Sequence, residues 1–249
     1  MALDNCISKG TLKSVYLENN TAIKVFEKEY PKAEVLYEAL NNARVEDTGL
    51  NIPKVLEVTM IEGKWAIRRE YVEGKTLYEL MKENPGEMDK YLEMMVDMQL
   101  KIHQKRNPLL NKLKDKMSKQ ITDLDCIDDA TKYDLHEKLE GMPKHTKLCH
   151  GDYNPKNIII DKDGELHVVD WVHASQGNAS ADVARTYLLL ALESKDIADK
   201  YMDLFCEKSG TQKRYVQQWL PIVAAAQLAK KRPEEKDLLF KWLDVFEYQ

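Results

Sequence analysis

The chain has 249 residues, 43% of them hydrophobic, so it is long and apolar enough to bury a core as one or two domains. Its 37 lysine and arginine residues against 42 aspartate and glutamate residues give a net charge of −5, which argues against a broad basic surface for nucleic acid or anionic membranes. The four cysteines (Cys6, Cys126, Cys149 and Cys206) form no CxxC pair, which argues against a disulfide framework or a structural zinc site.

The N-terminal segment MALDNCISKG contains no apolar stretch of signal-peptide length. The sequence also lacks the uncharged apolar run of about 18 residues that a membrane-spanning helix needs. We therefore expect a cytoplasmic protein that has neither a membrane nor a nucleic acid as its partner.

The first third of the sequence predicts strands and one helix. Residues 15–17 and 22–26 flank the turn Glu18-Asn-Asn-Thr21, which indicates a hairpin. Pro31 opens a stretch with apolar residues at helical spacing, namely Val35, Leu36, Ala39, Leu40 and Ala43. After Pro53, residues 55–58 and 65–67 flank a Glu62-Gly63 turn and predict a second hairpin.

Beyond residues 69–74 the pattern becomes helical. Two apolar stripes have a 3.6-residue period: Met94, Met95, Met98 and Ile102, then Leu110, Leu113, Met117, Ile121 and Leu124. We expect the lysines of the second stretch to form a solvated face: Lys112, Lys114, Lys116 and Lys119. One β segment over 147–171 and helices around 187–194, 197–208 and 215–230 complete the chain. The prediction is an α+β protein with a small β-rich lobe over residues 1–72 and a larger helical lobe over 73–249.

A second hairpin signal places polar side chains together. Asp163-Gly164 lies between apolar runs and favours a two-residue type I′ turn, in which Ile160 faces His167 and Asn157 faces Asp170. Directly opposed residues have Cβ atoms about 4.5–5.5 Å apart. Amide and carboxylate oxygens are ligands that Mg²⁺ accepts alongside substrate phosphates. A register slip of one residue would separate the pair.

These residues carry a resemblance to a known family. His150-Gly-Asp152, followed by Asn157 and then by Val168-Val-Asp170-Trp, resembles the signature of the aminoglycoside phosphotransferase-like kinases, which share the eukaryotic protein-kinase architecture. The resemblance implies a bilobal protein-kinase-like fold and an ATP- and Mg²⁺-dependent phosphotransferase that acts on a hydroxyl group of a small molecule.

The resemblance also implies residue roles in the C-terminal lobe. Asp152 would be the catalytic base that orients the acceptor hydroxyl, and Asn157 and Asp170 would hold the magnesium ions that bridge the ATP phosphates. Asp182 resembles the structural aspartate that braces the catalytic loop from the next helix. We expect His150 to hold this loop by hydrogen bonds rather than to transfer protons.

In the N-terminal lobe, Lys24 lies in mid-strand with apolar neighbours on its own face, which is costly unless its ammonium meets a negative charge. In the family this lysine contacts the ATP phosphates and pairs with a helix glutamate. Glu38 is our choice for that partner, and Glu34, one turn earlier, fits almost as well.

Two further nucleotide contacts follow from the resemblance. Residues 7–16 resemble the hairpin that covers the phosphates, although Gly10 is its only glycine, and a lone glycine is weak evidence. Residues 69–74 resemble the hinge between the lobes, where backbone groups near Glu70 and Val72 would bind adenine.

Two other functions remain open at this point. A protein kinase of the same architecture is disfavoured because no APE-like segment follows Asp170 and Asp182 comes twelve positions after it. A nucleotide-binding regulatory module without catalysis is disfavoured because Lys24, Asp152, Asn157 and Asp170 are all present.

The identity of the acceptor is not readable from the sequence. A polycationic antibiotic would require clustered carboxylates, and one acidic run is present: Asp123, Asp125, Asp128 and Asp129. We expect this run to be a solvated loop.

Overall fold

A computed structural model describes residues 3–243. Contacts divide the chain into two compact units, which alternate along the sequence. The first unit contains the residues up to Glu83 together with Pro155–Ala174, and the second contains Asn84–Asn154 and the residues from Ser175 onward. The predicted lobes, residues 1–72 and 73–249, assign residues 73–83 and 155–174 differently from these units. The roles predicted for the lobes, nucleotide binding in the first and catalysis with acceptor binding in the second, stay predictions.

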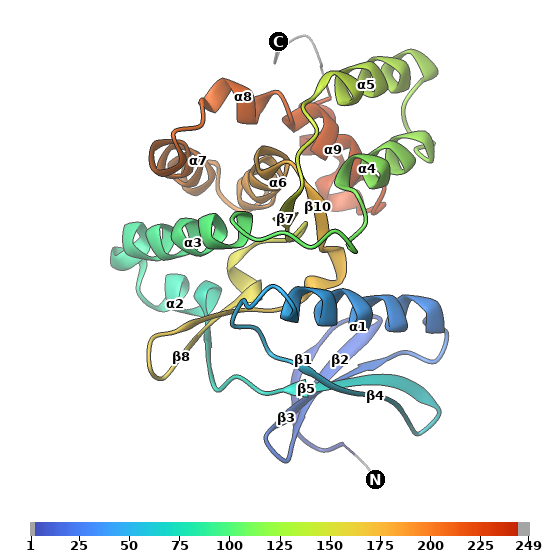
Figure 1. Ribbon diagram of the computed structural model, residues 1–249, viewed down its shortest axis with the longest axis vertical. Helices are drawn as coiled ribbons and strands as arrows, with labels where there is room; N and C mark the ends of the chain where they lie inside the picture. The colour runs from blue at the N-terminus through green and yellow to red at the C-terminus, as the bar shows by residue number, and fades with distance from the viewer. Residues whose placement is uncertain (1–2, 244–249) are drawn as a thin grey trace. The chain divides into compact units, whose positions relative to one another are not determined.

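The first unit is built on a five-stranded antiparallel sheet in the order β1-β2-β3-β5-β4 (Figure 1). Its strands are β1 (Cys6–Lys9), β2 (Lys13–Glu18), β3 (Thr21–Phe26), β4 (Val55–Ile61) and β5 (Lys64–Glu70). The two hairpins predicted in this region are present. Asn19 and Asn20 have φ angles of 48° and 58° in the β2–β3 turn, which is the conformation that a type I′ turn requires.

The helix α1 (Lys32–Glu46) begins directly after Pro31 and packs against β4 and β5. Phe26, Val35, Ala39 and Ile67 form the apolar cluster between the helix and the sheet. The predicted apolar stripe is only partly correct, because Leu36 and Leu40 are exposed. Three of the other buried positions of α1 are polar, namely Glu38, Asn41 and Asn42, and the fourth is Val45.

A smaller three-stranded sheet in the order β6-β8-β9 completes the first unit. It contains β6 (Gly74–Thr76), β8 (Ile158–Asp161) and β9 (Leu166–Val168), with the helix α2 (Leu77–Glu83) and the 3₁₀ turns η2 (Pro155–Asn157) and η3 (Trp171–His173) beside it. The β8–β9 hairpin confirms the predicted β segment, but the predicted register is wrong by one residue. Ile159 faces His167, and Ile160 faces Leu166.

The side chain of Asp161 accounts for the different register. Its Oδ1 accepts hydrogen bonds from the backbone N–H groups of Asp163 and Glu165, both at 2.9 Å. The connection is therefore a three-residue loop over 162–164, closed by a hydrogen bond of 3.1 Å from the N–H of Asp161 to the carbonyl oxygen of Glu165. Gly164 has a positive φ of 84° in this loop. As a consequence, the backbone of Asn157 pairs with Val169 rather than with Asp170.

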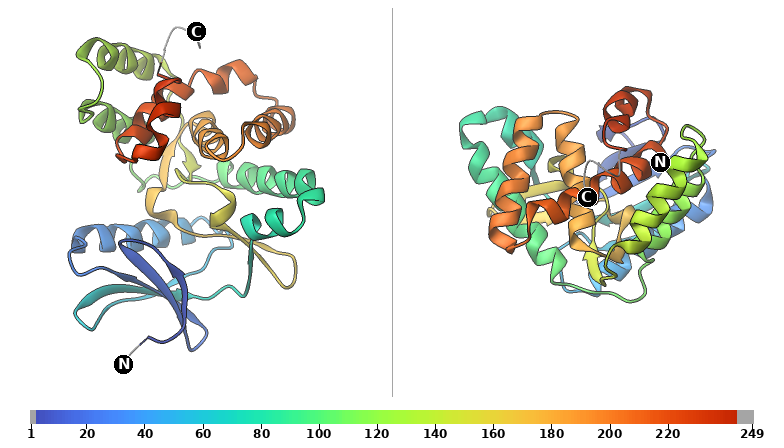
Figure 2. Two further views of the ribbon diagram at one scale, coloured as in Figure 1. Left: turned by 180° about the vertical axis from the view of Figure 1, so that it is seen from behind. Right: turned by 90° about the horizontal axis from the view of Figure 1, so that it is seen from above.

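The second unit is mainly helical. Its helices are α3 (Met88–His103), α4 (Leu113–Thr122), α5 (Asp129–Gly141), α6 (Ala179–Ala191), α7 (Lys195–Ser209), α8 (Lys213–Gln217), α9 (Leu220–Leu228) and α10 (Lys236–Phe240), with 3₁₀ turns η1 (Pro85–Glu87) and η4 (Pro233–Glu235). The short strands β7 (Lys147–Cys149) and β10 (Ser175–Gly177) pair antiparallel. Both α6 and α4 pack on α9, and α4 runs beside α5 (Figure 2).

Three features of this unit differ from the sequence prediction. The region 215–230 forms two helices, α8 and α9, because Pro221 lies in the first turn of α9. Part of the acidic run begins α5, since the Asp128 carboxylate accepts a hydrogen bond from the N–H of Thr131 at 2.7 Å. The solvated lysine face is also wrong at Lys114, whose side chain is 13% exposed and donates to the carbonyl oxygens of Glu140 and Met142.

No helix within residues 3–243 is both long and apolar enough to cross a membrane. All four cysteines are free thiols, as the sequence indicated.

We predict that Gly74→Ala destabilises the first unit, because a Cβ at this position would lie 2.8 Å from the carbonyl carbon of Ile160 on the neighbouring strand. The expected loss in the free energy of unfolding is about 1–3 kcal/mol, measured by chemical denaturation. Gly86→Ala is the control, since nothing lies within 4 Å of a Cβ there. Equal stability of the two variants would contradict the tight approach of β6 to β8.

Candidate active site

In the first unit, a buried lysine joins two carboxylates from different elements. The ammonium of Lys24, in β3, lies 2.6 Å from Oε1 of Glu38 in α1 and 2.9 Å from Oδ1 of Asp170, which follows β9. The side chains of Lys24 and Glu38 are 6% and 4% exposed. Of the two glutamates considered for Lys24, Glu38 is therefore the one in contact, and Glu34 is exposed.

Further cations surround these carboxylates. Lys13 Nζ lies 3.3 Å and Arg69 Nη2 lies 3.9 Å from the Glu38 carboxylate. Burial acts to raise the pKa of Asp170, but the charge and hydrogen bond of Lys24, helped by Arg69 and Lys13, hold this pKa well below its usual range. Asp170 is therefore an anion at neutral pH.

The backbone of Asp170 has a left-handed conformation, with a φ of 65°. A non-glycine residue rarely adopts this conformation, and such residues concentrate at functional sites. Because Val169 donates its N–H to the Asn157 carbonyl at 2.9 Å, Asn157 and Asp170 leave the backbone at neighbouring positions.

These two side chains offer a carboxylate and an amide oxygen, which suit Mg²⁺ when a nucleotide supplies further oxygens. Within residues 3–243, no group of three or more His, Cys, Asp or Glu side chains is arranged to hold a metal ion without such help. The donor set therefore fits a metal that arrives with a phosphate ligand.

The other predicted nucleotide contacts lie at strand ends. Gly10 forms the turn between β1 and β2, where its N–H donates to the Lys13 carbonyl at 2.8 Å. The N–H of Glu70 donates to the Lys54 carbonyl at 3.0 Å, so an adenine contact here requires the Glu70 carbonyl or the backbone of Val72. The roles of Gly10, Glu70 and Val72 stay predictions.

In the second unit, Asp182 of α6 holds the loop that carries Asp152. Its carboxylate accepts hydrogen bonds from the N–H groups of Gly151 at 2.7 Å and His150 at 3.2 Å. Gly151 has a φ of 77°, and the left-handed conformation at this position is readily adopted by glycine. The family resemblance implies such a bracing role for Asp182, and that role stays a prediction.

Two histidines complete this support. His103 Nε2 lies 3.0 Å from Asp182 Oδ2, so this histidine is more than the packing residue suggested by its place at the end of an apolar stripe. Burial acts to raise the pKa of Asp182, but the hydrogen bond and charge of His103 and the Gly151 N–H outweigh it and lower the pKa. His150 is fully buried and its Nδ1 accepts the N–H of Asp152 at 3.2 Å, consistent with a role in holding the loop.

Asp152 itself lies among cations that the sequence did not single out. Its Oδ1 is 3.3 Å from Lys230 Nζ, just after α9, and 3.5 Å from Arg185 Nη2 in α6. The side chain of Asp152 is 25% exposed, so it remains accessible to a ligand. Arg185 could have been noticed in the sequence, because it is a charged residue within the apolar run of α6.

Lys116 of α4 belongs to the same group, although it was assigned to a solvated face. Burial, followed by the charges of Arg185 and Lys230, lowers the pKa of Lys116 to about 8. Burial and the charge of Arg185 likewise lower the pKa of Lys230 to about 8, against the opposing effect of Asp152. We call Lys116, Arg185 and Lys230 the basic cluster.

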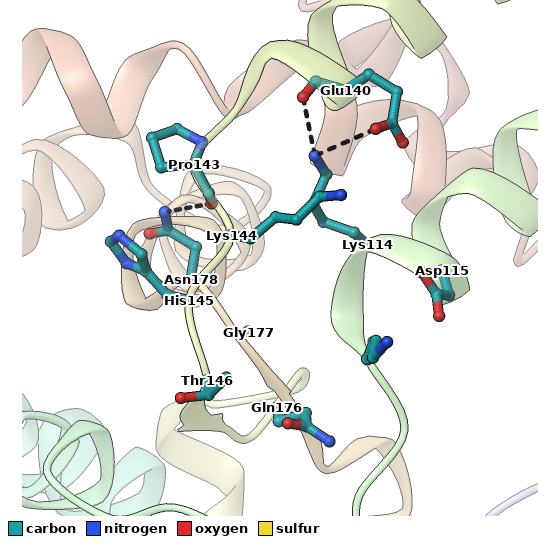
Figure 3. Close-up of a pocket in the computed structure, with 11 residues that line it drawn as sticks. Lys114, Asp115, Glu140, Pro143, Lys144, His145, Thr146, Gln176, Gly177 and Asn178 are labelled. Carbon is teal, nitrogen blue, oxygen red and sulfur yellow. Dashed lines mark hydrogen bonds and ion pairs between the residues drawn. The ribbon is translucent and has the colours of Figure 1, made fainter. Parts of the chain in front are cut away.

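The second unit also contains a pocket elsewhere (Figure 3). Residues of α4, the segment 143–146 and the junction of β10 with α6 line it. Lys114, one of these lining residues, donates a hydrogen bond to the carbonyl oxygen of Glu140 at the end of α5. None of the residues predicted for the active site lines this pocket. It adjoins the start of β7, whereas the Asp152 loop follows the end of that strand.

Comparison with known proteins assigns the chain to a family. The sequence profile described as the phosphotransferase enzyme family matches residues 7–219. The chain belongs to this family. No curated protein matches the sequence.

Solved structures of similar fold agree with this assignment. A thermostable mutant of aminoglycoside phosphotransferase APH(4)-Ia, in ternary complex with ADP and hygromycin B, aligns with a TM-score of 0.68 at 15% identity, over 96% of this chain and 88% of that one. Aminoglycoside phosphotransferase APH(2'')-Ib in its ADP-bound form aligns with a TM-score of 0.62 at 17% identity, over 98% and 92% of the two chains.

A choline/ethanolamine kinase family protein from Mesorhizobium loti aligns with a TM-score of 0.55 at 16% identity, over 97% of this chain and 85% of that one. These matches confirm the predicted α+β, protein-kinase-like fold class. At such low identity they establish the fold alone.

In this phosphotransferase-family chain, we predict that Lys24→Met costs about 3 kcal/mol in the free energy of unfolding, because it removes the closest partner of the buried Glu38 carboxylate. The double variant Lys24→Met/Glu38→Gln should recover much of that loss in chemical denaturation. Lys64→Met is the matched control, since it breaks an ion pair with Glu27 whose side chains are 38% and 40% exposed. A loss for Lys24→Met no larger than the loss for Lys64→Met would contradict a buried pair.

We also predict that two lysines titrate far below the others. The ammonium groups of Lys116 and Lys230, with pKa values of about 8, should be charged below that pH and become neutral above it. Reductive ¹³C-methylation followed by NMR titration measures these midpoints, and Lys116→Met and Lys230→Met assign the two signals. If both signals titrated near the ordinary lysine value of about 10.4, the charges would not be crowded as described.

Proposed function

We propose that the protein transfers the γ-phosphoryl group of ATP to a hydroxyl group of a small molecule, with Mg²⁺ as the cofactor. The observation that carries the proposal is the contact of the buried Lys24 ammonium with both Glu38 and Asp170. Glu38 fixes the position of the lysine, and Asp170 ties it to the metal-binding end of β9. A phosphate-binding lysine and a metal-binding aspartate require this proximity, because both act on one triphosphate.

In the first unit, Lys24 would bind phosphate oxygens, and Asn157 and Asp170 would hold Mg²⁺. The metal ion neutralises charge on the phosphate oxygens when it is bound. Gly10 and the backbone near Glu70 and Val72 would contribute the nucleotide contacts implied by the family. Glu38, held by Lys13 and Lys24, keeps the lysine side chain extended toward Asp170.

In the second unit, Asp152 would accept a hydrogen bond from the acceptor hydroxyl and take up its proton as the phosphoryl group is transferred. His150 and Asp182 fix the backbone of its loop. Asp152 and Asn157 are five residues apart along the chain, so connectivity alone keeps their Cα atoms within about 18 Å. Catalysis of this kind depends mainly on positioning and charge neutralisation.

A small acceptor is favoured over a protein acceptor by the short segment that follows the metal-binding aspartate. Only residues 171–178 separate Asp170 from α6, and the turn η3 and the strand β10 occupy most of them. This segment is too short for a long activation loop that a phosphorylation event would order.

We predict that Asp152→Ala lowers the rate of phosphoryl transfer by about 10²–10⁴-fold while Mg-nucleotide binding is retained. Asp170→Asn should also abolish transfer, but through weaker binding of Mg-nucleotide, because the metal loses an anionic ligand. ADP release with an acceptor identified from a metabolite library measures transfer, and calorimetry measures nucleotide binding.

Asp163→Asn serves as the control, since Asp163 lies in the exposed β8–β9 turn. An undiminished rate in Asp152→Ala or Asp170→Asn would overturn the assignment. Nucleotide binding without ADP release for any acceptor would favour a regulatory module instead.

A further inference from the structure

The basic cluster places three positive charges beside one accessible carboxylate. Lys116 comes from α4 and Arg185 from α6, and Lys230 follows the end of α9, on which both α4 and α6 pack. The side chains of Arg185 and Lys230 are 8% and 21% exposed, and both approach the same oxygen of Asp152. The cluster therefore belongs to the interior of the unit rather than to a freely solvated surface.

The neighbouring charges do not balance the cluster. Arg232 adds a fourth cation that acts on Arg185 and Lys230, and Glu235 pairs with it at 2.9 Å. Asp182 attracts Lys116, but its carboxylate already accepts the loop N–H groups and the hydrogen bond of His103. Even with Asp182 counted beside Asp152, the cations outnumber the carboxylates.

The contacts with Asp152 are also loose. The distances of 3.3 Å to Lys230 and 3.5 Å to Arg185 exceed the 2.7–2.9 Å of a tight charge-assisted hydrogen bond. The contact of Arg185 with Asp152 also joins one nitrogen to one oxygen, unlike the two parallel bonds of a fork-like arginine–carboxylate pair. Nε of Arg185 is buried and has no hydrogen-bond partner among the described residues. Arg185 and Lys230 can therefore bind another anion without first breaking a strong bond to Asp152.

Burial is the main cause of the lowered pKa values of Lys116 and Lys230, and the neighbouring cations lower them further. An anion among them would reverse the effect.

The acidic run, by contrast, is engaged within the protein. Asp123 pairs with Lys119 at 2.8 Å, Asp125 pairs with Lys231 at 2.7 Å, and Asp128 caps α5. Three carboxylates of the acidic run thus make local contacts, whereas Asp129 is fully exposed and lies 4.0 Å from Lys132.

We propose that the acceptor is itself an anion, a hydroxyl compound with a carboxylate or phosphate group that Lys116, Arg185 and Lys230 bind while its hydroxyl faces Asp152. The proposal rests on the proposed function, and it adds the chemical class of the substrate. It predicts that simple anions occupy the cluster even without nucleotide or transfer.

The first test measures direct binding of inorganic phosphate and of citrate to the full chain. The NMR signals of its reductively ¹³C-methylated lysines report the binding. Millimolar phosphate or citrate should raise the titration midpoints of Lys116 and Lys230 and leave those of Lys119 and Lys231 unchanged. Lys119 and Lys231 are matched controls because they lie on or beside the same helices with side chains 78% and 69% exposed. Equal shifts in all four lysines, or no shift in any, would overturn the proposal.

The second test uses ADP release with small hydroxyl compounds that differ in charge: anionic glycerate and glycerol 3-phosphate, neutral glycerol, and cationic choline. Acidic members should be preferred, and Lys116→Met and Lys230→Met should each raise the KM for them by about 10–100-fold with little change in the KM for ATP. Lys116→Arg should restore much of the loss, and Lys119→Met and Lys231→Met should behave like the unaltered protein.

The possible results distinguish a failure of the anionic-acceptor proposal from a failure of the proposed phosphoryl transfer. Phosphate binding at the cluster without ADP release for any acceptor would remove the proposed function but leave an anion site. Preferred phosphorylation of choline, or a fall in kcat at unchanged acceptor KM in both lysine variants, would overturn the anionic acceptor and leave phosphoryl transfer intact.

Discussion

The buried ion pair between Lys24 and Glu38 is the interaction on which the first unit's part of the candidate site depends. An ammonium group that is removed from water requires a closely placed anion, and Glu38 provides it from α1 at 2.6 Å. The same ammonium reaches Asp170, so one side chain links β3, α1 and the end of β9. Well-packed apolar residues would often stabilise a fold as well as such charges do. Stability alone therefore does not account for these charges, whereas the phosphate and metal binding proposed above would.

A carboxylate on a helix organises the second unit's part of the site in a different way. Glu38 fixes a side chain, whereas Asp182 fixes a backbone, because it accepts the successive N–H groups of His150 and Gly151. The positive φ of Gly151 allows both groups to converge on one carboxylate. His103 adds a third hydrogen bond from α3. The loop that carries Asp152 is therefore held by a buried polar network, in which the loss of one partner leaves the others unsatisfied.

The sequence predicted those parts of the fold that depend on local patterns. The Asn19-Asn20 turn was correct because both residues tolerate the positive φ that a type I′ turn requires. The same reasoning failed at Asp163-Gly164, because the side chain of Asp161 stabilises a longer loop and shifts the register by one residue. Asn157 and Asp170 still leave the backbone at adjacent positions, since the strand pairing moved by only one step. The predicted direct pairing of Asn157 with Asp170 is therefore wrong, and their role as metal ligands stays a prediction.

The basic cluster shows where sequence reasoning stops. Lys116 lies at a polar position of α4 and Lys230 lies just after α9, and the pattern around each predicts contact with water. Their proximity to Arg185 and Asp152 arises only when α4 and α6 pack on α9. Arg185 was the one detectable member, because α6 carries no other cation between Asp182 and its end at Ala191. The net charge of −5 likewise gives no hint of a positive interior site, since composition sums charges that the fold separates. Like charges held this close disfavour the ligand-free protein, and such a cost is characteristic of binding sites whose charges are balanced only when a ligand is present.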